Sequence, residues 1–422
     1  MDKLLIRGRE RLSGTIPISG SKNAVLPMMA ASLLTRGLTT IRNVPDLVDV
    51  HTMSNVLRII GAKVVFEDNV LQIDTETFNY PEAPYDLVRK MRATYYVLAP
   101  LLAHMKKAKV SLPGGCVIGP RPVDQHIKAL EALGARIRLE KGYIIADAEE
   151  LHGCEIFFDL VSVGATAQAM MAATLAKGDT ILENVAKEPE VVALAQFLSS
   201  MGAKIKGAGS DIIEIKGVEQ LQPTDFTNIP DRIETGTYMA AAVITGSRLT
   251  LEGADQKNIK TIIRKMREVG ATVKTVKNGI EVAGPSVIKP TDIHTHPFPA
   301  FPTDMQAQMM AILSVADGRS VITEGIYPER FSHAPELCRL GAQIVIEDNK
   351  ALVTGVHKLE GASVMASDLR ASAALVLAGL VADGETEILR VYHIDRGYEK
   401  IEEKLAAVGA QMKRIKEGDD ET

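Results

Sequence analysis

The 422-residue sequence predicts an α/β protein made of two similar domains, each containing three copies of one structural unit. A Gly-Ala pair followed by a polar and then an apolar residue occurs six times, with successive glycines 68 to 73 residues apart. Such regular self-similarity is typical of structural repeats, and the chain is longer than one hydrophobic core usually supports. The six pairs begin at Gly61, Gly134, Gly202, Gly270, Gly341 and Gly409.

Each unit reads in the same order along the chain. An Ala- and Met-rich helix comes first, and because it is apolar on all sides we expect it to be buried. The clearest examples are residues 165–176, 238–244, 305–316 and 371–382. A strand follows, and then an outer helix such as 126–133, which the glycine of the Gly-Ala pair terminates. A strand pair completes the unit, turning through residues such as Glu67-Asp68-Asn69 or Glu347-Asp348-Asn349.

Three units per domain give two domains of about 200 residues each, within the usual range. We expect the first domain to span residues 22–229 and the second to contain residues 1–21 and 230–422, with the boundary near Asn228-Ile229-Pro230. The N-terminal strand precedes the first unit and is expected to complete the last one.

Composition excludes several classes of protein. The net charge is −5 and no run of Lys and Arg stands out, which disfavours a sequence-independent nucleic-acid binder. No stretch approaches about 20 apolar residues, so no membrane insertion is expected. The three cysteines, Cys116, Cys154 and Cys338, are too few and too scattered for a disulfide framework. Reduced thiols and a cytoplasmic location fit this pattern.

The starts of the six Ala- and Met-rich helices are equivalent positions, 64 to 72 residues apart, at which charged or capping residues recur. They are Lys22, Arg92, Ser162, Arg232, Asp304 and Asp368, and Arg370 follows the last of them. Thr303 and Gln306 have the spacing of a capping box. Helix N-termini attract phosphate and carboxylate groups. One such cation is usually an ordinary surface charge, but four of them (Lys22, Arg92, Arg232 and Arg370) predict an anion-binding cleft between the domains.

The connection from Leu112 to Asp124 is two to four residues longer than its equivalents, and it is rich in Gly and Pro. It carries Cys116 close to Arg121, and a nearby cation increases the thiolate character of a cysteine. A mobile loop of this kind can deliver a reactive group to a substrate. Cys154 and Cys338 are instead expected to be buried structural cysteines. His294 and His296 lack a third ligand at a suitable spacing, so no metal site is expected.

Five motifs together resemble the family of UDP-N-acetylglucosamine 1-carboxyvinyltransferases, over essentially the whole chain. They are Ser19-Gly20-Ser21-Lys22-Asn23-Ala24, the loop from Leu112-Pro113-Gly114-Gly115-Cys116 to Arg121-Pro122-Val123-Asp124, Ser162-Val163-Gly164-Ala165-Thr166, Pro230-Asp231-Arg232-Ile233-Glu234-Thr235-Gly236 and Phe301-Pro302-Thr303-Asp304. The loop is the most specific of the five. One departure is Leu160, where some relatives have a lysine near the nucleotide.

The resemblance implies two inside-out α/β barrels, each of three βαβαββ units, and an enolpyruvyl transfer from phosphoenolpyruvate to UDP-N-acetylglucosamine without a cofactor. It implies that phosphoenolpyruvate is held by Lys22, Asn23, Arg121, Arg370 and Arg396. The UDP-sugar would be held by Arg92, Arg121, Pro122, Val123, Asp124, Gln125, Ser162, Val163, Gly164, Asp304 and Ile326, and the helix-start pattern adds Arg232 and Asp368.

The implied catalytic residues are Cys116, Asp304, Lys22 and Arg396. Cys116 is the loop acid and the thiol that the epoxide fosfomycin alkylates in this family. Asp304 is a reasonable base, because a helix N-terminus keeps a carboxylate ionised.

Two other functions remain alternatives. The shikimate-pathway enolpyruvyl transferase shares the repeat architecture, but its substrate is small and it does not need the cysteine loop. A catalytically impaired regulatory paralogue would bind the UDP-sugar without turning it over, and the presence of Lys22, Cys116 and Asp304 disfavours it. Turnover with each acceptor separates the three.

Overall fold

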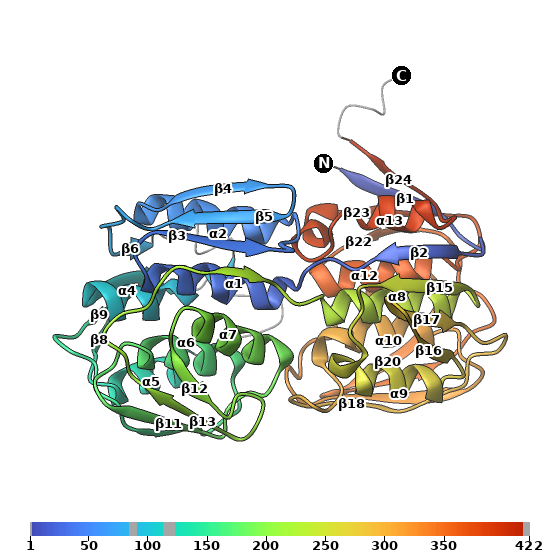
Figure 1. Cartoon of the computed structure of the whole chain (residues 1–422). Coiled ribbons are helices and arrows are strands. Elements are labelled where there is room, and N and C mark those ends of the chain that lie inside the picture. Colours follow the sequence, from blue (N-terminus) through green and yellow to red (C-terminus); the bar gives the residue numbers. More distant parts are fainter. Residues whose placement is uncertain (1, 84–90, 113–122, 417–422) are drawn as a thin grey trace. The chain divides into compact units, whose positions relative to one another are not determined.

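The computed structural model describes residues 2–83, 91–112 and 123–416, and these divide into two units. The N-unit contains the described residues from Gly20 to Ile229, and the C-unit contains those up to Ser19 and from Pro230 onward. The chain therefore passes between the units twice, at Ser19–Gly20 and at Ile229–Pro230. Within the described ranges the strands form six separate four-stranded sheets (Figure 1).

The N-unit is built around helices that follow one another in the predicted order. Its buried helices are α1 (Lys22–Ala31), α4 (Leu98–Met105) and α6 (Val163–Ala173), and its outer helices are α2 (Val48–Ile60), α5 (Asp124–Ala132) and α7 (Pro189–Ser200). Short 3₁₀ turns are η1 (Ser32–Leu34) and η2 (Arg92–Val97).

The sheets of the N-unit have the following strand orders: β14 (Asp225–Thr227), β3 (Leu38–Arg42), β5 (Val70–Asp74) and β4 (Lys63–Glu67); β6 (Glu82–Ala83), β7 (Lys107–Ser111), β9 (Tyr143–Asp147) and β8 (Arg136–Glu140); β10 (Glu155–Phe157), β11 (Asp179–Glu183), β13 (Ile212–Lys216) and β12 (Lys204–Lys206).

The C-unit repeats this plan. Its buried helices are α8 (Arg232–Ile244), α10 (Gln306–Leu313) and α12 (Leu369–Gly379), and its outer helices are α9 (Lys260–Glu268), α11 (Ala334–Arg339) and α13 (Ile401–Ala407). The 3₁₀ turns are η3 (Gln256–Asn258), η4 (Thr303–Met305) and η5 (Val391–Arg396). In Figure 1 the sheets lie around α8, α10 and α12, which also contact one another.

The sheets of the C-unit have the following strand orders: β16 (Thr272–Val276), β17 (Gly279–Ala283), β15 (Arg248–Glu252) and β2 (Ser13–Pro17); β18 (Ile293–Thr295), β19 (Arg319–Glu324), β21 (Lys350–Thr354) and β20 (Gln343–Glu347); β22 (Ser363–Met365), β23 (Glu385–Leu389), β1 (Lys3–Arg7) and β24 (Gln411–Ile415).

The predicted repeat is confirmed at its two most regular positions. The six glycines that end the outer helices all have φ between 95° and 107°, the left-handed conformation that a side chain disfavours. The buried helices are apolar all round because they are covered on all sides: every residue of α8 from Ile233 to Ile244 is buried. The fold thus places helices inside and sheets outside, as expected.

At the two places where the chain passes between the units, the strand that precedes the buried helix belongs to a sheet of the other unit. In four of the repeats the strand before the buried helix pairs in parallel with the strand after it, as β18 and β19 do around α10. The strand before α1 is β2, which instead pairs with β15 of the C-unit, and the strand before α8 is β14, which pairs with β3 of the N-unit. The N-terminal strand β1 lies between β23 and β24 and completes the last repeat, as predicted.

Two sequence-based expectations are wrong. Thr303 does not cap a helix: the chain forms the 3₁₀ turn η4 there, Pro302 is its N-cap, and the Thr303 hydroxyl donates to Glu324 instead. Cys338 is exposed rather than buried, because it lies on the outward side of the short helix α11, while Cys154 is half-buried and donates to the Ala132 carbonyl.

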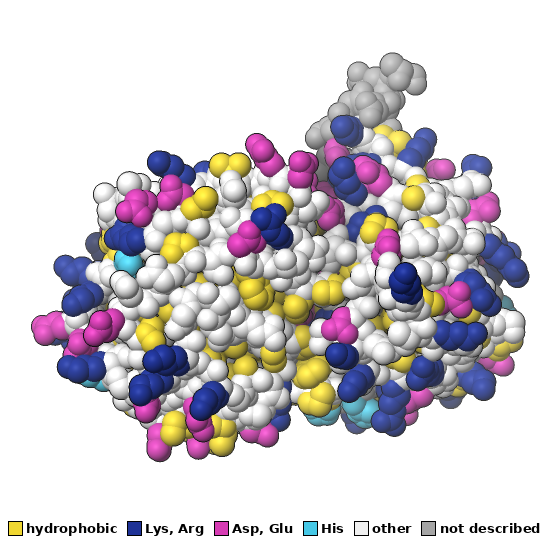
Figure 2. Space-filling model, viewed as in Figure 1, with side chains coloured by type: hydrophobic (Ala, Val, Ile, Leu, Met, Phe, Trp, Pro, Cys, Tyr) yellow, Lys and Arg dark blue, Asp and Glu magenta, His cyan; other side chains and the backbone are white. Residues whose placement is uncertain are grey.

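Positive and negative side chains are interspersed over the face shown in Figure 2, in keeping with the small net charge. None of the helices that the structure describes combines the length and hydropathy of a membrane span. In the same residues, no group of three or more His, Cys, Asp or Glu side chains is arranged to hold a metal ion.

The central position of β1 predicts that its inward face is important for the stability of the C-unit. Ile6→Ala removes a fully buried side chain and should lower the free energy of unfolding by about 2 to 5 kcal/mol. Leu5→Ala, on the half-buried face of the same strand, should cost less than half as much. Urea unfolding of the two variants measures the difference, and equal losses would contradict the inward role of Ile6.

Candidate active site

The buried helices of the C-unit begin with side chains that satisfy their free N–H groups. Asp231 accepts hydrogen bonds from the backbone N–H groups of Ile233 and Glu234 at the start of α8. Asp368 accepts equivalent bonds from Arg370 and Ala371 at the start of α12. Asp368, a predicted substrate-binding residue, therefore uses one carboxylate oxygen as a helix cap.

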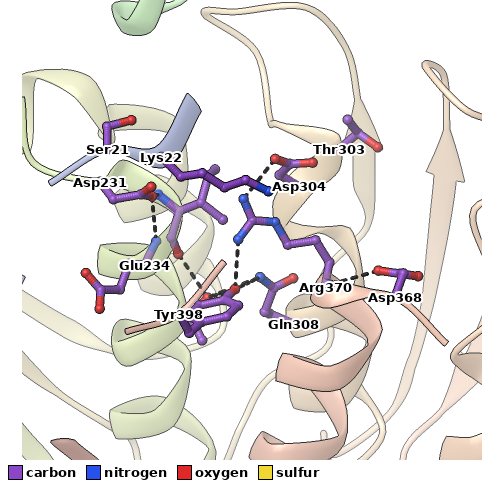
Figure 3. Close-up of polar contacts among 12 residues, drawn as sticks. Ser21, Lys22, Asp231, Glu234, Thr303, Asp304, Gln308, Asp368, Arg370 and Tyr398 are labelled. Atoms are coloured by element: carbon purple, nitrogen blue, oxygen red, sulfur yellow. Dashed lines mark hydrogen bonds and ion pairs between the residues drawn. The ribbon is translucent and has the colours of Figure 1, made fainter. Parts of the chain in front are cut away.

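The start of α10 differs from these, and it carries a buried cluster of charged side chains (Figure 3). Asp304 in η4 forms ion pairs with two buried arginines: Arg330 Nη1 lies 2.8 Å from Oδ1, and Arg370 Nη2 lies 3.0 Å from Oδ2. The arginine side chains are 6% and 3% exposed and that of Asp304 is 26% exposed. One carboxylate thus faces two guanidinium groups and keeps some contact with solvent.

The electrostatics of this cluster keep Asp304 ionised. Burial by itself raises the pKa of the Asp304 carboxyl, but the positive charges of Arg370 and Arg330 outweigh it and hold the pKa well below its usual range. The expected cause was the helix dipole, and the structure shows that two guanidinium groups are the main source instead. A carboxylate in this state is a weak base as long as both arginines stay paired with it.

A second carboxylate, Glu324 at the end of β19, organises the backbone around Asp304. Its oxygens accept hydrogen bonds from the hydroxyls of Thr295 and Thr303 at 2.6 and 2.9 Å. They also accept from the backbone N–H groups of Ile326 and Tyr327. Glu324 is fully buried, so it fixes both η4 and the segment that leads to Arg330.

Thr303 links this framework to the ion pairs, because its hydroxyl accepts a hydrogen bond from Arg330 Nη1 at 3.0 Å while it donates to Glu324. Ile326, a predicted contact of the UDP-sugar, is held in the same framework through its backbone N–H. The C-unit therefore presents Asp304, Arg330 and Ile326 from one hydrogen-bonded scaffold.

In the N-unit, Lys22 at the start of α1 is 7% exposed and pairs with Asp49 of α2 at 2.6 Å. The helix begins at Ser21, whose hydroxyl accepts a hydrogen bond from the Ala24 backbone N–H. Asn23 follows Lys22 and is half-buried. This ion pair with Asp49 places the ammonium group of Lys22 at a defined position at the start of α1.

The start of α6 is packed against a tyrosine–histidine pair. Ser162 caps the helix by accepting from the Ala165 backbone N–H, and Val163 and Gly164 form its first turn. Tyr95 and His126 are hydrogen-bonded at 2.8 Å. A Cβ atom on Gly164 would lie 2.2 Å from the Tyr95 hydroxyl, so the close approach of the helix start requires glycine.

The start of α5 is joined to the segment before α6. The side chain of Gln125 accepts from the Asp159 backbone N–H at 3.0 Å and donates to the Asp159 carboxylate, which also pairs with Lys128. The nearby Leu160 is 66% exposed. Gln125 therefore fixes the segment that leads to Ser162, in addition to any contact with a ligand.

The other predicted residues have the following places. Val123 is the N-cap of α5 and Asp124 its first residue, and Arg92 begins η2. Arg396 ends η5 and is half-buried. The Arg232 guanidinium lies 5.8 Å from the centre of the Phe298 ring and lines a cavity of about 50 Å³. Cys116, Arg121 and Pro122 lie outside the described residues.

Sequence reasoning missed three polar residues of these clusters: Arg330, Glu324 and Asp49. It also missed Tyr398, whose hydroxyl accepts a hydrogen bond from Arg370 Nη1 at 3.1 Å. Arg330 and Glu324 were absent from the predicted set because they follow a strand of the repeat rather than begin a buried helix. A usable signal was present for Glu324, which is an acidic residue at the end of a strand that the repeat places next to a buried helix.

Comparisons with known proteins identify the fold and the family of the chain. Residues 6–405 match the family described as EPSP synthase (3-phosphoshikimate 1-carboxyvinyltransferase). The crystal structure of the enolpyruvyl transferase NikO from Streptomyces tendae superimposes with a TM-score of 0.89, at 26% identity, covering 98% of this chain and 99% of that one. The fold and site thus define the enolpyruvyl transferase class.

Sequence relatives narrow this class. The UDP-N-acetylglucosamine 1-carboxyvinyltransferase of Geobacter metallireducens is 53% identical over 99% of this chain and 100% of its own length. The protein of the same name from Chloroherpeton thalassium is 54% identical over 98% of this chain and 97% of its own length. The chain belongs to the family of UDP-N-acetylglucosamine 1-carboxyvinyltransferases.

The contact between Gly164 and Tyr95 gives a prediction about stability. Gly164→Ala should lower the free energy of unfolding by about 1 to 3 kcal/mol, because the new methyl group overlaps the Tyr95 hydroxyl. Adding Tyr95→Phe removes that hydroxyl and should restore part of the loss, although the His126 ring still lies close. Urea unfolding of the two single variants and the double variant measures this coupling, and strictly additive losses would exclude the predicted overlap.

Proposed function

We propose that this chain transfers the enolpyruvyl group of phosphoenolpyruvate to the 3′-hydroxyl of UDP-N-acetylglucosamine and releases phosphate. This is the first committed step in the synthesis of peptidoglycan precursors, and we place the enzyme in the cytoplasm. The observation that carries the proposal is the ionised Asp304 between Arg330 and Arg370, in a chain whose relatives carry the name of this activity.

Both substrates are anionic, and the proposed binding residues provide the opposite charge. Phosphoenolpyruvate is bound by Lys22, Asn23, Arg121, Arg370 and Arg396. The structure adds Arg330 as a further cation next to Arg370, since both contact Asp304. The UDP-sugar is bound by Arg92, the run Arg121 to Gln125, Ser162, Val163, Gly164, Arg232, Asp304, Ile326 and Asp368.

The proposed domains are residues 22–229, and 1–21 with 230–422, each contributing part of this set. Their helix starts present backbone N–H groups and cations to phosphate and carboxylate oxygens. Preorganised charges of this kind stabilise the negative charge that develops during the transfer, and the proposed steps use no cofactor.

The proposed reaction has an addition step and an elimination step. In the addition, the 3′-hydroxyl gives its proton to Asp304 as its oxygen bonds to C2 of phosphoenolpyruvate, and C3 gains a proton from the Cys116 thiol. In the elimination, C3 gives a proton back to the Cys116 thiolate, the double bond re-forms, and the bond from C2 to the phosphate oxygen breaks, with the leaving phosphate taking up the proton that Asp304 received. The Cys116 thiolate can also attack C2 as C3 gains a proton, and this forms a covalent adduct of the enzyme with phosphoenolpyruvate.

The ion pairs of Asp304 explain when the base becomes active. In the free protein both arginines hold the pKa of Asp304 well below its usual range. The carboxylate and phosphate of phosphoenolpyruvate compete for the same guanidinium N–H donors. As the arginines shift toward the substrate, the pKa of Asp304 rises and the carboxylate becomes a stronger base. Substrate binding thus prepares the proton transfer.

The first test is phosphate release by the purified protein. Phosphoenolpyruvate with UDP-N-acetylglucosamine should yield inorganic phosphate in a molar amount equal to the enolpyruvyl product. Phosphoenolpyruvate with shikimate 3-phosphate should yield none. Release only with shikimate 3-phosphate would favour the shikimate-pathway activity, and no release with either acceptor from folded protein would favour the regulatory paralogue.

Arg330 provides a test of the role of Asp304. A general base must be deprotonated, so its lowered pKa places the acid limb of the pH profile of kcat/KM far below neutral pH. Arg330→Gln removes one of the two charges that lower this pKa, so the acid limb should move to higher pH. Arg264→Gln removes an exposed arginine of the same unit and should leave the limb in place. An unchanged limb in the Arg330 variant would argue against Asp304 as the base.

A further inference from the structure

Tyr398 lies at the centre of a buried hydrogen-bond network in the C-unit, between η5 and α13. Its side chain is 1% exposed. The hydroxyl lies 3.1 Å from Arg370 Nη1, 3.2 Å from Gln308 Nε2 and 2.9 Å from Thr237 Oγ1 (Figure 3). These contacts join α12, α10 and α8, the three buried helices of the unit.

The direction of each hydrogen bond follows from counting protons. Thr237 donates its hydroxyl proton to the Ile233 backbone carbonyl at 2.9 Å, so Tyr398 must donate its own proton to Thr237. Arg370 and the Gln308 amide nitrogen have only donors to offer. Both lone pairs of the Tyr398 oxygen are therefore directed to these two donors, and one of them is dedicated to Arg370.

This arrangement fixes the Arg370 guanidinium at two of its nitrogens. Nη1 donates to Tyr398, and Nη2 donates to Asp304 at 3.0 Å. The negative charges that act on Arg370 are those of Asp304 and Asp231, and Arg330 is a nearby positive charge that also pairs with Asp304. A planar guanidinium held at two points has a defined orientation. With the hydrogen bond from Nη2 to Asp304 alone, the guanidinium could pivot about that contact.

We propose that Tyr398 is a positioning residue for the transfer reaction, which sets the orientation of Arg370 toward Asp304 and toward the carboxylate of phosphoenolpyruvate. The inference rests on the proposed function, because it requires that Arg370 bind that substrate.

The network itself indicates that this role is specific to Arg370. If the Tyr398 hydroxyl were absent, Gln308 would still donate to Thr237 at 3.1 Å, and Thr237 would still donate to Ile233. Arg370 Nη1 and one N–H of Gln308 lose an acceptor, but Gln308 keeps its hydrogen bond to Thr237, whereas Arg370 Nη1 loses its bond to the tyrosine. Removing the hydroxyl therefore acts chiefly on the guanidinium and leaves the contacts between α8 and α10 in place.

The test is Tyr398→Phe in the full chain, with steady-state kinetics for both substrates. Loss of one hydrogen bond to a charged group should raise the KM for phosphoenolpyruvate about tenfold or more and lower kcat. The KM for UDP-N-acetylglucosamine should change less than about twofold. Of the proposed contacts of that substrate, Asp304 is the one that pairs with Arg370, and the others do not take part in the network. The acid limb of kcat/KM should move to higher pH, since a less constrained Arg370 stabilises the Asp304 carboxylate less.

Tyr238→Phe is the matched control. Tyr238 is a tyrosine of α8 that is equally buried, and among the described residues its hydroxyl has no hydrogen-bond partner. This variant should leave both KM values and the pH profile unchanged. Thr237→Val is a second variant, which removes the acceptor of the Tyr398 proton while keeping the side-chain shape. It should raise the KM for phosphoenolpyruvate and shift the acid limb in the same directions as Tyr398→Phe, but by smaller amounts.

The outcomes separate the inference from the proposed function. Absence of turnover by the wild-type protein would overturn the proposed function and the inference with it. With an active wild type, a Tyr398→Phe variant that matches Tyr238→Phe would overturn the inference alone. Lower thermal stability with unchanged KM values would show a structural role and would also overturn it. If Tyr398→Phe does not fold, unchanged kinetics of folded Thr237→Val would overturn the inference.

Discussion

The arrangement of the C-unit depends on the pairing of one carboxylate, Asp304, with two buried guanidinium groups. A charge removed from water is costly unless it is paired and hydrogen-bonded, and Arg330 and Arg370 are almost fully buried. Each must therefore be held against Asp304 by the surrounding structure. Glu324 and Thr303 hold Arg330 and the Asp304 backbone from one side, and Tyr398 holds Arg370 from the other.

The same constraint connects stability with chemistry. A pair that satisfies the buried charges of the free protein also weakens Asp304 as a base. The proposed substrate carries anionic groups that can replace Asp304 as the partner of the arginines. The buried guanidinium groups are therefore paired with a negative charge both in the free protein and in the substrate complex. Lys22 and Asp49 repeat the principle in the N-unit, where a buried cation has a carboxylate partner before any substrate arrives.

The repeat architecture explains why these charges lie where they do. Six copies of one unit give equivalent helix starts, and the fold uses most of them for ordinary capping by residues such as Ser21, Ser162, Asp231 and Asp368. The second and fifth starts depart from the pattern, since the 3₁₀ turns η2 and η4 lie there without a side-chain cap, and Asp304 in η4 pairs with the two arginines. The tight contact of Gly164 with Tyr95 and His126 is a similar local departure in the N-unit.

The sequence by itself determined the repeat, the buried helices, the glycines that end the outer helices and the place of the N-terminal strand. Each of these follows from the spacing of residues along the chain or from a backbone preference such as that of Gly61. It also brought Asp304 and Arg370 into the candidate set through their equivalent positions. Only the tertiary structure decided that Asp304 pairs with Arg330, that Tyr398 orients Arg370, and that Thr303 serves Glu324 rather than a helix. Those contacts join residues 21 to 28 positions apart, and pairing between such side chains depends on how the elements pack, which local sequence patterns do not specify.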